Sequence, residues 1–184
     1  MSIELGGWSI DPSLCDYIRK ILPDGSTILE LGSGAGTEWL AEYYTMYSVE
    51  HNEKFVDKYK STYFYCPLTK HKALRNHDGP MEWFDRDILK PALIALDGKY
   101  DLLLIDGPPG GTRCGIVKYI ELFRSDVPIV LDDLHRQADR KIINSIASKL
   151  RKPYVTYGYL DGKPFGVIND PCLSCGDAIN DKNS

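Results

Sequence analysis

Short apolar runs alternate with segments of helical spacing along most of the chain. The apolar runs predict buried strands at residues 27–31, 46–49, 63–66, 100–105 and 128–131. Apolar positions with helical spacing predict helices at 12–21, around 39–43, and at 54–60, 88–96, 115–123 and 142–150. Strands that are apolar throughout are buried on both faces, and their alternation with helices is typical of a parallel sheet covered on both sides. The pattern therefore predicts a doubly wound α/β domain.

The end of the chain breaks this alternation. Residues 154–160 and 165–168 are two strand-like runs with no helix between them, and Asp161-Gly162-Lys163 joins them with residues typical of a hairpin turn. The last strand is therefore expected to run antiparallel to its neighbour. Residues 169–184 have no apolar period, so we expect one domain over residues 1–168 and a flexible polar tail over 169–184.

Length and composition narrow the class of protein. A chain of 184 residues favours a single domain. Its 22 basic and 26 acidic side chains give a net charge of −4, which offers no general attraction to nucleic acid or to an anionic membrane. The sequence has no basic-then-apolar leader and no apolar stretch long enough to span a bilayer, and its five cysteines are scattered. We therefore expect a cytoplasmic protein in a reducing compartment.

A glycine-rich loop, Glu30-Leu31-Gly32-Ser33-Gly34-Ala35-Gly36, lies between the first strand and the following helix. Glycines at that point allow a tight turn and close backbone approach to a ligand at the carboxyl edge of the sheet. The simpler interpretation is a tight turn without a ligand. Glu50 ends the second strand, 20 residues after Glu30, where a carboxylate can accept hydrogen bonds from both hydroxyls of an adenosine ribose.

At this point residues 28–168 resemble the class I S-adenosylmethionine-dependent methyltransferases. The resemblance rests on the G-x-G-x-G spacing, on Glu50, on Asp106 after the fourth strand of the pattern, and on the terminal hairpin. It implies the Rossmann-like methyltransferase fold with a mostly parallel, seven-stranded sheet and an antiparallel C-terminal hairpin. The residues that it implies for binding of S-adenosylmethionine are Glu30, Gly32, Ser33, Gly34, Gly36, Glu50, His51, Cys66, Leu68 and Asp106, with Trp83 and Phe84 as further neighbours of the adenine.

The residues after Asp106 are Gly107-Pro108-Pro109-Gly110. Methyltransferases that act on amino groups of DNA bases carry two prolines directly after the acid and then an aromatic residue. Here a glycine intervenes and Gly110 replaces the aromatic residue, so an amino nitrogen on DNA is disfavoured as the acceptor.

Asp132-Asp133-Leu134-His135 follows the fifth strand. Neighbouring strands lie about 4.8 Å apart, so Asp106, Asp132 and Asp133 are expected to share one crevice. Three carboxylates suit Mg²⁺ or another hard divalent cation, and the arrangement resembles metal-dependent O-methyltransferases of sugars and catechols. The alternative is that Asp133 caps the next helix and Asp132 is solvated.

A hydroxyl acceptor is too weak an acid to attack a methyl sulfonium unaided, so it needs a general base or a metal ion. His135 is the candidate base, with Asp106 and Asp133 on the same reacting side. The alternative for His135 is a histidine on a surface loop.

Two polar segments have open interpretations. The first carries Lys70, His71, Lys72, Arg75 and His77, which could bind an anionic acceptor or RNA, or be a solvated insertion at residues 69–82. Together with Gly6-Gly7-Trp8 it could form an acceptor wall. Cys172 and Cys175 form a C-x-x-C pair without the second pair that a structural zinc site needs.

Together these features predict an S-adenosylmethionine-dependent O-methyltransferase that acts on a sugar, a glycan or another polyhydroxylated small molecule. The chain could be one module of a larger glycan-modifying protein. The alternatives are an RNA methyltransferase and a non-catalytic module that binds S-adenosylmethionine.

Overall fold

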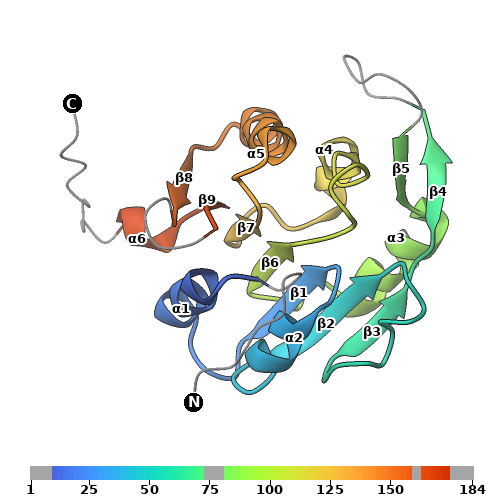
Figure 1. Cartoon of the computed structure of the whole chain (residues 1–184), viewed down its shortest axis with the longest axis horizontal. Helices are drawn as coiled ribbons and strands as arrows, with labels where there is room; N and C mark the ends of the chain where they lie inside the picture. Colours follow the sequence, from blue (N-terminus) through green and yellow to red (C-terminus); the bar gives the residue numbers. More distant parts are fainter. Residues whose placement is uncertain (1–9, 73–80, 159–162, 175–184) are drawn as a thin grey trace.

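The computed structural model describes residues 10–72, 81–158 and 163–174. Its main sheet has seven strands in the order β3-β2-β1-β6-β7-β9-β8 (Figure 1). The strands are β1 (Thr27–Leu31), β2 (Thr45–Glu50), β3 (Thr62–Tyr65), β6 (Leu102–Ile105), β7 (Ile129–Leu131), β8 (Tyr154–Tyr157) and β9 (Phe165–Ile168). Strands β3, β2, β1, β6 and β7 are parallel, and β9 runs antiparallel between β7 and β8. The predicted seven-stranded sheet with a reversed terminal strand is confirmed.

Helices cover both faces of this sheet. Successive strand residues point to opposite sides, and both sets are apolar, so each face is buried under a layer of helices. On one face α1 (Pro12–Ile21) and α2 (Ala35–Leu40) pack on strand residues such as Ile28 and Leu104. On the other face α3 (Arg86–Leu96), α4 (Gly115–Tyr119) and α5 (Gln137–Leu150) pack on residues such as Leu29 and Leu103. A short 3₁₀ helix, Ile120–Leu122, extends α4.

The predicted polar insertion at 69–82 is partly wrong. Strands β4 (Leu68–His71) and β5 (Met81–Phe84) pair antiparallel as a separate two-stranded sheet. The pairing is stable because Met81, Trp83 and Phe84 are buried in the core next to α4. Residues 73–80, with Arg75 and His77, lie outside the described residues.

The helix predicted at 54–60 is also wrong. That segment consists of turns in which the amides of Phe55, Val56 and Lys58 donate to carbonyls three residues earlier. Asp57 has φ +58°, the left-handed conformation that interrupts a right-handed helix.

The flexible tail predicted from residue 169 is wrong as far as Ser174. Asp170 is buried, its Oδ1 accepts a hydrogen bond of 2.8 Å from the Tyr17 hydroxyl, and its Oδ2 accepts one from Tyr157. The short helix α6 (Pro171–Ser174) follows, with the Cys172 amide donating to Asp170. Residues 175–184, with Cys175, and residues 1–9, with Gly6-Gly7-Trp8, lie outside the described part of the chain.

Within the described ranges, the longest and most apolar helices still fall short of what crossing a membrane requires.

Candidate functional site

A cavity of about 420 Å³ lies at the carboxyl ends of β1, β2, β6 and β7. Open α/β sheets bind ligands at this edge, where the strand order reverses between β1 and β6. The loops after these strands line most of it: Gly32, Ser33, Gly34, Ala35, Glu50, His51, Asn52, Phe55, Tyr59, Asp106 to Gly110, Arg113, Asp132, Asp133, Arg136 and Lys163. The volume is in the range of ordinary small-molecule sites.

The glycine loop and the loop after β6 touch through their backbones. Gly32 has φ +84°, and a Cβ on it would lie 2.8 Å from the Cα of Gly107. A Cβ on Gly107 would lie 2.7 Å from the Cα of Gly32. This contact explains the glycine that follows Asp106, because no residue with a side chain fits there without moving one of the loops.

Glu30 and Gly36 support the loop and do not line the cavity. Oε1 of Glu30 accepts hydrogen bonds from Thr37 and Ser48, and Thr37 in turn accepts one from the amide of Gly34. Burial raises the pKa of Glu30 to about 8 even though these hydrogen bonds oppose the rise. A Cβ on Gly36 would collide with the side chain of Ile10, so this glycine allows α2 to pack closely.

Glu50 lies at the end of β2 with its carboxylate at the cavity, as predicted. Its oxygens accept hydrogen bonds from Ser33, His51 and Asn52. Burial favours the neutral acid, but these hydrogen bonds outweigh burial and lower the pKa of Glu50 below its ordinary value. Glu50 is therefore a charged acceptor at neutral pH. His51 also lines the cavity, and its Nδ1 lies 2.9 Å from Glu50 Oε1.

The predicted adenine neighbours are not at the cavity. Cys66 is buried and its thiol donates to the carbonyl of Asp85, and Trp83 and Phe84 belong to the core. Leu68 packs against that core as well. The aromatic side chains beyond Glu50 are instead Phe55 and Tyr59, which the incorrectly predicted helix at 54–60 had concealed.

The three predicted carboxylates meet at the opposite end of the cavity. One oxygen from each of Asp106, Asp132 and Asp133 lies within 4.8 Å of the others. Burial is the main cause that raises the pKa of Asp106 to about 6 and that of Asp132 to about 7, and the neighbouring carboxylates add to both. The alternative in which Asp133 caps α5 is excluded, since the N-cap residue is Arg136 and it receives no side-chain cap.

Arg113 is the central residue that sequence reasoning missed. Its side chain is only 2% exposed, and its guanidinium lies 3.6 Å from Asp106, 3.3 Å from Asp133 and 3.2 Å from Asp139. It also donates to the backbone carbonyls of Pro108, Asp132 and Asp106. The fixed fork of five donors allows one arginine to join the loops after β6 and β7 to α5.

The carboxylate set fits a divalent cation in donor type and spacing. Oδ2 of Asp133 is held by Arg113 at 3.3 Å and Arg136 at 2.9 Å, which leaves Oδ1 of that residue for a cation. Burial raises the pKa values of Asp106 and Asp132 although the charge of Lys163 opposes both rises, and a bound cation would further favour the charged forms of these carboxylates. These two carboxylates and Oδ1 of Asp133 are the atoms that would hold Mg²⁺.

His135 lies outside the cavity lining. Its side chain is 46% exposed, and its Nδ1 is 3.8 Å from Oδ1 of Asp133. Lys163, which the sequence had placed only in a hairpin turn, lines the cavity and lowers the pKa of both Asp106 and Asp132 through its charge. Lys163 is thus a further candidate for contact with a ligand in the cavity.

The remaining sequence candidates lie elsewhere. Lys70 and His71 belong to β4, where His71 contacts the Tyr119 hydroxyl at 2.8 Å, and neither residue nor Lys72 lines the cavity. Cys172 lies in α6, and the only cluster of metal-ligating side chains among the described residues is the aspartate one.

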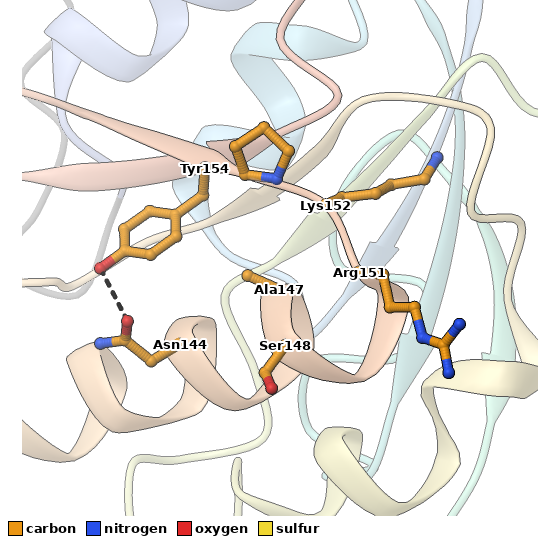
Figure 2. A pocket seen from close by; sticks show the side chains of 7 residues that line it. Asn144, Ala147, Ser148, Arg151, Lys152 and Tyr154 are labelled. Carbon is orange, nitrogen blue, oxygen red and sulfur yellow. Dashed lines mark hydrogen bonds between the residues drawn. The ribbon is translucent and has the colours of Figure 1, made fainter.

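A second hollow, of about 560 Å³, lies between the end of α5 and the start of β8 (Figure 2). Its seven lining residues include Arg151, Lys152 and Tyr154, whose hydroxyl donates to Asn144 at 3.1 Å. Its volume is larger than that of the first cavity, but its lining contains neither the clustered aspartates nor the glycine loop. We therefore assign the functional site to the first cavity.

The raised pKa of Asp132 predicts a pH dependence of stability. In the folded protein the pKa of this carboxyl is raised to about 7, whereas in the unfolded chain it returns to the ordinary aspartate value of 3.8. The folded state therefore binds more protons between these values, and stability is expected to fall as pH rises from about 4 to 7. Asp132→Asn, which keeps the acceptor for the Asp133 amide, should make this decline shallower in urea titrations at several pH values.

The exposed Asp16 provides the matched control, since Asp16→Asn removes a carboxyl that lies away from the cluster. Equal slopes for Asp132→Asn and the wild type would contradict a raised pKa at Asp132.

Comparisons with known proteins support the fold. No family model matches the sequence, and no curated protein resembles it significantly. Among solved structures, the O-methyltransferase from Bacillus cereus in complex with SAH has a TM-score of 0.51 and 16% identity, over 89% of this chain and 84% of that one. Precorrin 8w decarboxylase from Methanobacterium thermoautotrophicum has a TM-score of 0.51 and 14% identity, over 85% and 88%.

These similarities show that the chain has the Rossmann-like fold of the S-adenosylmethionine-dependent methyltransferases. One of these two proteins is an O-methyltransferase and the other a decarboxylase, so similarity of fold does not identify the reaction of this chain.

Proposed function

We propose that this protein is an S-adenosylmethionine-dependent methyltransferase that methylates a hydroxyl group of a sugar, a glycan or another polyhydroxylated small molecule. The observation that carries the proposal is that one cavity joins the glycine loop and Glu50 at one end to Asp106, Asp132 and Asp133 at the other. The first end suits a nucleoside, and the second suits an oxygen-rich acceptor.

Residues at different positions along the cavity have different roles in this proposal. Glu50 accepts hydrogen bonds from the ribose, and the backbone of the glycine loop allows close approach of the methionine part. When bound, S-adenosylmethionine supplies an electrophilic methyl group, and Mg²⁺ lowers the pKa of an acceptor hydroxyl. Arg113 holds the two acidic loops in one orientation, which keeps the carboxylates at the reacting end of the cavity.

The lining favours a small polar acceptor over a nucleic acid. The reacting end presents three aspartates beside Arg113, Arg136 and Lys163, so it has no excess of positive charge that would attract a phosphate backbone. Arg136 and Lys163 at the same end supply donors for hydroxyl or carboxylate groups of an acceptor. Within the described ranges, Lys70 and Lys72 lie away from the cavity, so no observation there favours RNA.

Calorimetric titration with S-adenosylhomocysteine tests the cofactor end. Glu50→Gln is expected to weaken binding about 10- to 100-fold, because a hydrogen bond to a charged group is worth about 1.5–3 kcal/mol. Glu53→Gln removes the same charge from an exposed position nearby and should bind as the wild type does. Absence of binding by the wild type would overturn the proposed cofactor.

A methyl-transfer screen over sugars and polyols tests the reacting end. We expect turnover that depends on Mg²⁺, that a chelator abolishes, and that Asp132→Asn lowers at least tenfold. Binding of S-adenosylhomocysteine without turnover of any hydroxylated acceptor would favour the non-catalytic binding module instead.

A further inference from the structure

Two arginines contact the aspartates at the reacting end of the cavity, and they use their donors differently. Arg113 is buried and donates both to carboxylates and to backbone carbonyls. Arg136 lines the cavity with its side chain 38% exposed, and its ion pairs with Asp133 and Asp139 both use Nη1, at 2.9 and 3.9 Å. Its Nε and Nη2 donate no hydrogen bond within the described residues. Arg136 therefore has donors left for a ligand in the cavity.

Gly110 makes room for the guanidinium of Arg136. A Cβ on Gly110 would lie 3.3 Å from Nη1 of Arg136, which is closer than ordinary van der Waals contact. Gly110 also lines the cavity, and it stands where the methyltransferases that act on amino groups of DNA bases carry an aromatic residue. The reacting end therefore has a planar cation beside a position that holds an aromatic ring in those enzymes.

The chemistry of this cation favours a carboxylate as its ligand. The planar fork of a guanidinium matches the two oxygens of a carboxylate and can bind them with two parallel hydrogen bonds. Asp133 and Asp139 also contact Arg113, at 3.3 and 3.2 Å, so neither depends on Arg136 alone for a counter-charge. The Nη1 contact with Asp133 holds the guanidinium at the aspartates, which places its remaining donors next to the reacting end.

We propose that Arg136 determines specificity by binding a carboxylate of the acceptor, so that the acceptor is a hydroxy acid such as a uronic acid. The acceptor hydroxyl then lies at the aspartates, and its carboxylate accepts hydrogen bonds from Nε and Nη2 of Arg136. The inference rests on the proposed function, and it narrows the acceptor from polyhydroxylated molecules in general to those that carry an acid group.

Calorimetric titration with glucuronate and glucuronamide, each in the presence of S-adenosylhomocysteine, tests the carboxylate site. The two probes have the same hydroxyls and nearly the same size, but only glucuronate is charged. The wild type should bind glucuronate about 10- to 100-fold more tightly, as expected for hydrogen bonds between two charged groups. Arg136→Met should remove this preference. Arg136→Lys should restore only part of it, because an ammonium group keeps the charge but lacks the fork.

Lys141→Met is the matched control, because it removes a positive charge from an exposed position further along α5. It should keep the preference of the wild type for the acid. Thermal unfolding close to that of the wild type shows that each variant is folded.

Three outcomes would overturn the carboxylate site and leave the proposed function standing. The first is no preference of the wild type for glucuronate, or a preference that survives Arg136→Met. The second is a larger effect of Arg136→Met on glucose 6-phosphate than on glucuronate, which would indicate a phosphate. The third is weaker binding of S-adenosylhomocysteine but not of 5′-methylthioadenosine by Arg136→Met, which would assign the arginine to the methionine carboxylate. Failure of the wild type to bind S-adenosylhomocysteine would overturn both proposals.

Discussion

Replacing Arg113 by methionine is expected to lower the free energy of unfolding by about 3–5 kcal/mol, the usual cost of breaking a buried ion pair by removing one partner. The guanidinium is 2% exposed and lies within 3.6 Å of three carboxylates, one of which, Asp139, is fully buried. Without it, those carboxylates repel each other in a site from which water is largely excluded. Urea unfolding at pH 8, where the carboxyls with pKa values of about 6 and 7 are ionised, measures the effect.

Arg136→Met is the matched control. Arg136 approaches Asp133 at 2.9 Å and Asp139 at 3.9 Å, but its side chain is 38% exposed. Water can replace it, so the expected loss is less than about 1 kcal/mol. Equal losses for the two variants would mean that Arg113 does not hold the acidic loops together.

Gly107→Ala is expected to abolish binding of S-adenosylhomocysteine and to lower the free energy of unfolding by about 2–3 kcal/mol, a cost typical of overpacking. The added methyl group would lie 2.7 Å from the Cα of Gly32, which is backbone and cannot rotate away. The glycine loop therefore has to shift at the point where S-adenosylhomocysteine is proposed to bind.

Gly111→Ala tests the specificity of that effect in the same segment, because nothing lies within 4 Å of a Cβ at Gly111. Its affinity and stability should match those of the wild type. Normal binding by Gly107→Ala would show that the contact between the two loops does not shape the cavity.

The main sheet could be predicted because its strands are short apolar runs, and the hairpin residues at 161–163 indicated the reversed last strand. The errors have physical causes. The left-handed Asp57 interrupts a segment whose spacing is helical, and β5 is held by tertiary burial of Trp83 and Phe84. The hydrogen bonds of Asp170 with Tyr17, which is 153 residues away in sequence, and with Tyr157 hold the chain in place beyond residue 168.

The positions of side chains that directly follow the strands could be predicted from the sequence. Glu50, Asp106, Asp132 and Asp133 all lie at the cavity for that reason. Arg113 was missed because its partners come from separate loops, and its only sequence signal is a lone arginine beside the apolar start of α4. Glu30 was expected at the ligand because it belongs to the glycine-rich motif. Its side chain instead accepts hydrogen bonds from Thr37 and Ser48 beneath the loop.

The reversal of β9 has a consequence for how such a protein can diversify. Strand β8 runs parallel to β7, and β9 runs in the opposite direction, so the connection between β8 and β9 lies at the same edge of the sheet as the cavity. There the carbonyl of Pro164 accepts a hydrogen bond from the amide of Leu134, and Lys163 lines the cavity. This hairpin is far from the glycine loop in sequence, and Lys163 is the residue of its described part that lines the cavity. Under the proposed function, changes in the length or composition of this hairpin would alter the acceptor end of the cavity and leave the glycine loop unchanged, so the two halves of the site can evolve separately.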